Sequence, residues 1–208
     1  GCGNSGRQRG GSAEGLGLKV VAFDIESKLP LGNAQPKATL FSLLEDAHVV
    51  SLHVPQHAST ELLIGSDEIA KLRHGAMLIN ASRGNVVDLD ALADALRSGR
   101  IGGAAIDVFP VEPRSNNDEF LSPLRGLDQS ILTPHIGGST AEAQENIGVE
   151  VAEKLTRYSD NGTTTSAVNF PEVALPEHDG KHRLLHVHQN IPGVMSAINQ
   201  VFSENNVN

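Results

Sequence analysis

The sequence has few features that would tie it to an oxidising compartment, a membrane or a nucleic acid. Cys2 is the only cysteine, which excludes an intramolecular disulfide and fits a reducing compartment, so a cytoplasmic location is expected. No apolar stretch is long enough to span a bilayer, and the first residues show no signal-peptide pattern. The formal net charge is −9 and there is no long basic run, which argues against nucleic acid or an anionic membrane surface as the main partner.

What the sequence does contain is enough apolar material for a folded core. With 208 residues, 39% of them hydrophobic, it could form one or two domains of ordinary size. It begins with glycine and not methionine, and we expect it to be a piece of a longer protein. We find no internal repeat, and we expect no metal site.

Short apolar runs alternate with helical patterns along the first two thirds of the chain. The predicted strands cover residues 18–23, 48–53, 76–80, 103–107 and 130–133. Because these runs are almost continuously apolar, we expect strands that are covered on both faces, as in a parallel sheet. Leu89, Leu92, Ala93 and Leu96 mark one face of a helix that should stop near Gly99, and a longer helix is expected over 140–158. This alternation predicts a doubly wound α/β fold.

After Asp160 the pattern changes. Residues 161–182 are typical of a linker, and a strand at 184–188 followed by a helix at 194–202 should begin a second unit.

The first chemical motif is the spacing of Gly1, Gly3 and Gly6, which matches a dinucleotide-binding turn. Asp24 ends a predicted strand at the distance expected of a carboxylate that binds a ribose hydroxyl, and an acid there favours NAD over NADP. Two features oppose this interpretation. No strand precedes the first glycine, and the helix that should follow contains two adjacent glycines in residues 7–11. Glycines of a flexible N-terminus are the alternative.

The second motif is spread over three predicted strand ends. Arg83, Asp107 and His135 each follow a strand, and Glu112 lies between prolines shortly after Asp107. Ligands of open α/β sheets bind at the carboxyl ends of strands, so these side chains could meet in one crevice. A guanidinium can bind a substrate carboxylate, an imidazole can exchange a hydroxyl proton, and a carboxylate beside the imidazole supports that exchange. Taken singly, each could instead be an ordinary turn or loop residue; together they favour a dehydrogenase of 2-hydroxy acids.

The segments INASRG (79–84), GAAIDVF (103–109) with Glu112, and TPHIGG (133–138) resemble the signatures of the D-isomer-specific 2-hydroxyacid dehydrogenases. The segments DIESKLPLGN (24–33), AQENIG (143–148), YSDNG (158–162) and SAVNFPEV (166–173) resemble the branch of that family that carries a C-terminal ACT domain. The likeness covers essentially the whole chain. It implies NAD-dependent oxidation of 3-phospho-D-glycerate in serine biosynthesis, inhibited by L-serine.

The resemblance also implies a role for each matching residue. Arg83, Glu112 and His135 match the catalytic arginine, glutamate and histidine, with His135 as the acid and base. The residues that it places at NAD are Gly1, Gly3, Asn4, Ser5, Gly6, Asp24, His53, Val54, Pro55, Ala81, Ser82, Arg83, Asp107, His135, Ile136, Gly137 and Gly138. In the second unit, LLHVHQNIPG (184–193) resembles the opening of an ACT domain, where His188, Asn190 and Asn208 match serine-binding positions. Ile191 departs from the basic residue that is usual there.

On this basis we expect an NAD-binding domain of Rossmann type over 1–138 that lacks its first strand, a helix over 139–160 that returns toward a substrate domain, a linker over 161–182, and part of an ACT domain over 183–208. The family implies a homo-oligomer, a tetramer. Without the substrate domain, the chain alone should be weakly active or inactive. Two alternatives stay open: another D-2-hydroxyacid dehydrogenase, acting on glyoxylate, hydroxypyruvate or 2-hydroxyglutarate, and a non-catalytic remnant that binds an amino acid.

Overall fold

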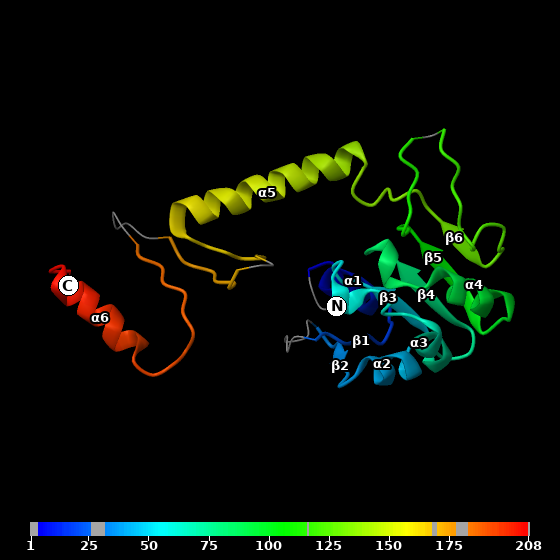
Figure 1. The fold of residues 1–208 in the computed structure, drawn as a ribbon, viewed down its shortest axis with the longest axis horizontal. Helices are drawn as coiled ribbons and strands as arrows, with labels where there is room; N and C mark the ends of the chain where they lie inside the picture. The colour runs from blue at the N-terminus through cyan, green and yellow to red at the C-terminus, as the bar shows by residue number, and fades with distance from the viewer. Residues whose placement is uncertain (1–3, 26–31, 116, 168–169, 178–182, 208) are drawn as a thin grey trace. The chain divides into compact units, whose positions relative to one another are not determined.

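A computed structural model describes residues 4–25, 32–115, 117–167, 170–177 and 183–207 of the chain (Figure 1). The chain divides into two compact units, Gly1–Gln144 and Glu145–Asn208. The division falls within the long helix α5 (Ala141–Asn161). Each unit is described by itself.

The first unit contains a parallel sheet of four strands in the order β3-β4-β5-β6 (Figure 1). The strands are β3 (Val49–Leu52), β4 (Ala76–Asn80), β5 (Ile101–Ile106) and β6 (Ser130–Leu132). Each forms where the sequence predicted a strand, and β4 has the predicted bounds. The prediction of a parallel α/β sheet of Rossmann type is therefore confirmed.

The strand predicted at 18–23 is shorter than expected. Only Val21–Ala22 forms β1, which pairs in parallel with β2 (Gln35–Pro36) in a separate sheet of two strands. Gln35 N donates to Val20 O over 3.0 Å and Lys37 N donates to Ala22 O over 2.8 Å, so both ladder bonds from β2 to β1 flank Pro36. Pro36 lies between these donors, where its missing N–H interrupts no bond to β1.

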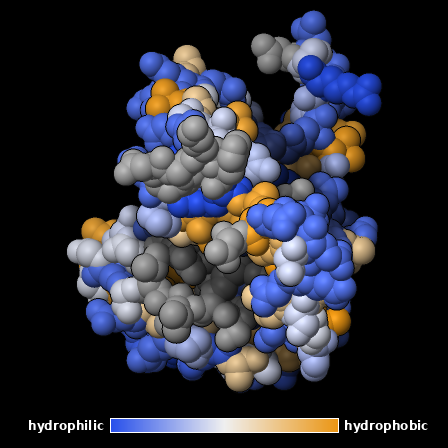
Figure 2. Space-filling view, turned by 90° about the vertical axis from the view of Figure 1, so that its left-hand side faces the viewer, coloured by the Kyte–Doolittle hydropathy of each residue, from blue (hydrophilic) through white to orange (hydrophobic). Residues whose placement is uncertain are grey.

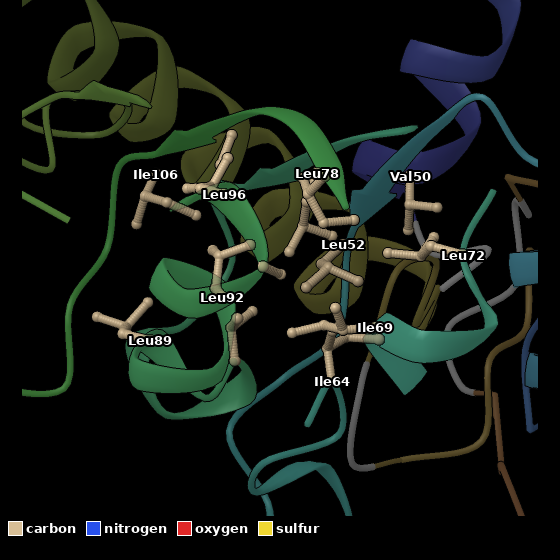
Figure 3. Packing of buried hydrophobic residues seen from close by; sticks show 14 of the residues in the cluster. Val50, Leu52, Ile64, Ile69, Leu72, Leu78, Leu89, Leu92, Leu96 and Ile106 are labelled. Atoms are coloured by element: carbon tan, nitrogen blue, oxygen red, sulfur yellow. The ribbon is translucent and has the colours of Figure 1, made fainter. Parts of the chain in front are cut away.

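One face of the four-stranded sheet is covered by three helices, α2 (Leu40–Asp46), α3 (Ser66–Lys71) and α4 (Leu89–Arg97). Val50, Leu52 and Leu78 on the strands point toward Leu92 and the other labelled core side chains in Figure 3. Leu78 and Leu92 are completely buried. Full burial of a leucine side chain stabilises the fold by about 1.5–3 kcal/mol, so this packing fixes where the strand ends lie.

Helix α4 begins and ends where its sequence predicts. The Asp88 carboxylate accepts hydrogen bonds from the N–H groups of Asp90 and Ala91, which satisfies donors of the first turn. At the other end Gly99 has φ of +73°, a left-handed conformation that glycine adopts without a Cβ clash. The predicted stop at Gly99 is confirmed.

The opposite face of the sheet is open among the described residues. Along β3 and β4 the burial alternates, so that Val49, Met77 and Ile79 are 49%, 53% and 36% exposed, and Ile131 on β6 is 66% exposed. The expectation that both faces are covered is wrong for this part of the chain. The reason is that α2, α3 and α4 contribute to one core cluster and therefore cover the same face.

A helix also forms where the sequence disfavours one. α1 (Asn4–Gly15) runs through the adjacent glycines at 10 and 11. A Cβ placed on Gly10 would lie 3.7 Å from Val20 Cγ1, and Leu18 N donates to Ala13 O over 3.0 Å, so the helix packs against the segment that leads into β1. Helix propensity is a weak preference, and tertiary contacts of this kind override it.

The second unit contains the rest of α5 and helix α6 (Val194–Glu204), close to the predicted helices. The strand predicted at 184–188 is wrong: these residues have no regular secondary structure and pair in no sheet. A strand needs a partner for its backbone groups, and none of the described residues provides one here. None of the helices in the described segments has the length and apolar character to cross a bilayer. Figure 2 shows hydrophobic side chains exposed among hydrophilic ones on one face of the molecule. In α5, Leu155 is 62% exposed.

Candidate active site

The carboxyl ends of β4, β5 and β6 carry the residues that the second motif predicted. Because these strands are parallel neighbours, their carboxyl ends lie at one edge of the sheet. Arg83 follows β4, Asp107 and Glu112 follow β5, and His135 follows β6. Arg83, Glu112 and His135 line one cavity of about 260 Å³. The structure therefore brings the three predicted catalytic side chains together.

His135 and Glu112 form the central pair of the site. The Nδ1 atom of His135 lies 3.0 Å from Glu112 Oε2 and 3.1 Å from Oε1. An ionised carboxylate only accepts hydrogen bonds, so Nδ1 carries the proton in this pair. Nε2 is then the ring nitrogen available for exchange with a bound hydroxyl group.

Glu112 is held in its ionised form by two donors. Partial burial by itself would raise the pKa of Glu112, but the hydrogen bonds from His135 and from the Phe109 N–H outweigh burial, and the pKa falls below its ordinary value. The Phe109 N–H donates to Glu112 Oε1 over 3.0 Å. The segment that follows β5 thus folds back on itself and directs the carboxylate toward His135.

The backbone at His135 has an uncommon conformation. Its φ is +53°, in the left-handed region that non-glycine residues seldom occupy. Asp107 stabilises the turn on both sides, because its Oδ1 accepts from Thr133 Oγ1 over 2.6 Å and from Ile136 N over 3.2 Å. Ser139 Oγ also donates to His135 O over 2.7 Å. Strained backbone supported in this way is typical of functional sites.

Arg83 lies on a turn that buried polar atoms hold in place. Asn80, the last residue of β4, is completely buried, and its side chain bonds to Ser82 N, Ser82 Oγ and Arg83 O. The guanidinium Nη1 donates to Ser82 O over 2.6 Å, so it lies against the same turn. Ala81 and Ser82, predicted beside the cofactor, form this turn.

Sequence reasoning missed several residues of the site. Gln56, Gly84, Val108, Phe109 and Pro110 also line the cavity. A Cβ on Gly84 would lie 2.0 Å from the carbonyl carbon of Phe109, so only glycine fits this approach. Gly84 lies in the INASRG segment, and Val108 and Phe109 lie in the GAAIDVF segment, so membership of these motifs was the sequence signal for them. Gln56 follows the predicted 53–55 segment directly, and no chemical pattern singled it out.

The remaining cofactor positions fall at other strand and helix ends. His53, Val54 and Pro55 follow β3, and Asp24 follows β1. Among the described residues these four do not line the cavity of the catalytic trio. Burial lowers the pKa of His53, as does nearby positive charge that includes Arg9, and Ser51 Oγ lies 2.9 Å from its Nε2.

The glycine-rich start is only partly within the described chain. Gly6 lies in α1, as do the backbones of Asn4 and Ser5, whereas Gly1 and Gly3 lie outside the described residues. The N-terminal N–H groups of a helix of this length bind anions such as a pyrophosphate. With Asp24 after the neighbouring strand, α1 and β1 fit the pyrophosphate and ribose ends of a dinucleotide.

Two further predicted groups can be placed. Ile136, Gly137 and Gly138 form the exposed turn after His135, and a Cβ on Gly137 would lie 3.5 Å from Asp107 Oδ2. In the second unit His188 and Asn190 are exposed, and His188 Nδ1 lies 2.9 Å from Gln189 O. Asn208 lies outside the described residues.

The chain is similar to known dehydrogenases. The family model described as "D-isomer specific 2-hydroxyacid dehydrogenase, NAD binding domain" matches residues 1–137. D-3-phosphoglycerate dehydrogenase of Haemophilus influenzae is 61% identical over the whole chain, and the Escherichia coli protein of that name is 59% identical. The chain spans about half the length of these relatives, 51% and 50%.

Solved structures give the same result for the fold. A D-lactate dehydrogenase from Sporolactobacillus superposes with a TM-score of 0.67 at 36% identity, over 79% of this chain and 52% of that one. An NAD-complexed dehydrogenase from Lactobacillus delbrueckii superposes with a TM-score of 0.68 at 27% identity, over 81% and 54%. The chain therefore belongs to the D-isomer-specific 2-hydroxyacid dehydrogenase family and contains its NAD-binding domain.

Proposed function

We propose that this chain is the NAD-binding and catalytic part of a D-3-phosphoglycerate dehydrogenase, which oxidises 3-phospho-D-glycerate to 3-phosphooxypyruvate for L-serine biosynthesis. The observation that carries the proposal is the His135–Glu112 pair with Arg83 in one cavity. The choice of substrate is supported by the names of relatives that are 59–61% identical over the whole chain.

The three side chains have complementary tasks in this reaction. Arg83 binds the substrate carboxylate, because a guanidinium pairs with a carboxylate through two parallel hydrogen bonds. His135 Nε2 then accepts the proton of the C2 hydroxyl group, while Glu112 keeps the ring in the required tautomer. NAD, when bound, accepts the hydride from C2. In the reverse direction His135 returns the proton to the carbonyl oxygen.

The cofactor half of the proposal can be tested on the chain itself. NADH fluorescence should show saturable binding to the purified 208 residues, with weaker binding of NADPH. Asp24→Ala should weaken NADH binding, because the ribose loses its acceptor, whereas Asp128→Ala, which removes an exposed carboxylate elsewhere in the chain, should not. Equal affinity of the two variants would contradict the assignment of Asp24.

The catalytic part of the proposal is tested together with the part of the relatives that this chain does not span. We would replace the matching half of the Haemophilus influenzae relative with this chain and assay the chimaera with 3-phospho-D-glycerate, D-lactate and 2-hydroxyglutarate. The highest kcat/KM is expected for 3-phospho-D-glycerate. Preference for another acid would assign the chain to a different dehydrogenase of the family. Serine binding without NADH binding or turnover would support the amino-acid-binding remnant instead.

We extend the proposal to regulation, assembly and location. Residues 183–208 are proposed to begin an ACT domain in which His188, Asn190 and Asn208 bind L-serine, within a homo-tetrameric cytoplasmic enzyme. The match to the Haemophilus influenzae relative supports this, since it is 61% identical over all 208 residues of this chain and so includes these positions. Inhibition of the chimaera by L-serine, lost in His188→Ala, is the expected result. Serine inhibition that survives this change would remove His188 from the site.

A further inference from the structure

Asn80 occupies a position where the sequence pattern of β4 calls for an apolar side chain. The inward-facing residues of this strand are Ala76, Leu78 and Asn80, of which Leu78 and Asn80 are completely buried. A buried amide destabilises the fold unless its donors and acceptor are bonded. Asn80 therefore needs a local reason to be there.

The reason lies in the turn that follows the strand. Asn80 Oδ1 accepts hydrogen bonds from Ser82 N over 3.1 Å and from Ser82 Oγ over 2.8 Å, and Asn80 Nδ2 donates to Arg83 O over 3.0 Å. One side chain thus closes the turn with both an acceptor and a donor. An aspartate could replace the acceptor but, when ionised, has no hydrogen to donate to Arg83 O.

The backbone of Asn80 connects the same turn to the next strand end. Asn80 O accepts from Asp107 N over 2.9 Å, and the segment after Asp107 carries Glu112. The side chain of Asn80 holds the peptide of Arg83, and its main chain holds the start of the segment that leads to Glu112. Asn80 therefore connects the peptide of Arg83 to the start of the segment that carries Glu112.

We propose that Asn80 is the positioning residue for Arg83, which it holds so that a 2-hydroxy acid bound by its carboxylate presents its C2 hydroxyl group to His135. This inference rests on the proposed function. Asn80 touches neither substrate nor cofactor in this role. It acts through the peptide of Arg83.

The test is Asn80→Asp in the chimaera, because aspartate has the shape of asparagine. At pH 8 the ionised carboxylate repels Arg83 O, and kcat/KM for reduction of 3-phosphooxypyruvate should fall on the order of 100-fold, the effect of a displacement of about 1 Å. Burial raises the pKa of such a carboxyl group, so toward pH 5.5 it should become protonated and donate to Arg83 O again. The kcat/KM of the variant should then rise toward that of the parent chimaera measured at the same pH.

The kcat/KM of Asn80→Asp is divided by that of the parent chimaera at each pH. This ratio removes the effect of ionisable groups that both proteins contain, which include the neighbouring Asp107, Glu112 and His135. Asn85→Ala is the matched control, since the Asn85 Oδ1 is buried without a hydrogen-bond partner among the described residues. Its activity should stay within about twofold of the parent. A ratio for Asn80→Asp that does not change with pH, or no loss at pH 8, would overturn the inference.

A crystal structure of Asn80→Asp at pH 8 keeps the inference testable if the chimaera shows no turnover. Absence of turnover in the parent chimaera would refute the proposed function. The inference about Asn80 would then be decided by the position of the turn at 81–83: displacement away from Glu112 supports it, and an unmoved turn refutes it.

Discussion

Gly84→Ala is the substitution whose effect follows most directly from the structure. The added Cβ would lie 2.0 Å from the carbonyl carbon of Phe109, 2.2 Å from its oxygen and 2.5 Å from Pro110 N. All three atoms belong to the backbone, so no side-chain rotation can relieve the overlap. Either the turn that carries Arg83 or the segment that leads to Glu112 must move.

Gly84→Ala should lower both the stability of the fold and the rate of the reaction. Overpacking of this kind destabilises proteins by about 1–3 kcal/mol, and each kcal/mol lowers the melting temperature by roughly 2–4 °C in a chain of this size. The displacement also separates Arg83 from the His135–Glu112 pair, and a shift of about 1 Å lowers the rate on the order of 100-fold. Activity should therefore fall at temperatures where the variant is still folded.

The assay combines thermal unfolding with kcat/KM of the chimaera for 3-phospho-D-glycerate. Gly11→Ala is the control, because a Cβ there meets nothing within 4 Å and Gly11 lies inside helix α1. That change should stabilise the protein by about 0.5–1 kcal/mol, since glycine is unfavourable in helices. Normal stability and activity of Gly84→Ala would refute the close approach of the two strand-end segments.

Three further predictions concern the catalytic pair and the core. His135→Gln in the chimaera should lower kcat roughly 10²–10⁴-fold, because the group that exchanges the substrate proton is removed. Glu112→Gln should have a lower melting temperature than the parent at neutral pH. The reason is that a carboxyl group whose pKa is lowered by folding stabilises the folded state at pH values above its ordinary pKa of 4.5. The difference in melting temperature should vanish as the pH falls through the lowered pKa. Leu92→Ala, at a fully buried position, should lower the free energy of unfolding in urea by about 2–5 kcal/mol. Leu121→Ala, at a position 73% exposed, should change it by less than about 0.5 kcal/mol.

Short sequence segments were enough to predict the strands and helices that depend on neighbouring residues or on regular strand pairing. β4 forms at 76–80 because a continuous apolar run there pairs with β3 on one side and with β5 on the other, and α4 stops near Gly99 because glycine tolerates a positive φ. The convergence of Arg83, Glu112 and His135 was predictable because parallel strands end at one edge.

The features that could not be predicted depend on contacts between distant residues. The left-handed backbone of His135 requires Asp107, which lies 28 residues earlier and bonds to both sides of the turn. The role of Asn80 depends on its burial, which its sequence position does not reveal. The strand expected at 184–188 failed for the opposite reason, because a strand pattern is not sufficient without a partner.

The open face of the sheet should make self-association of the chain depend on the salt concentration. Val49, Met77, Ile79 and Ile131 are exposed apolar side chains of β3, β4 and β6 in one sheet, and an apolar surface favours self-association in water. The net charge of −9 opposes association, but only over the Debye length, which shrinks from about 30 Å at 0.01 M salt to about 3 Å at 1 M. Light scattering of the purified chain should therefore rise with ionic strength, and low-salt buffers should keep it dispersed.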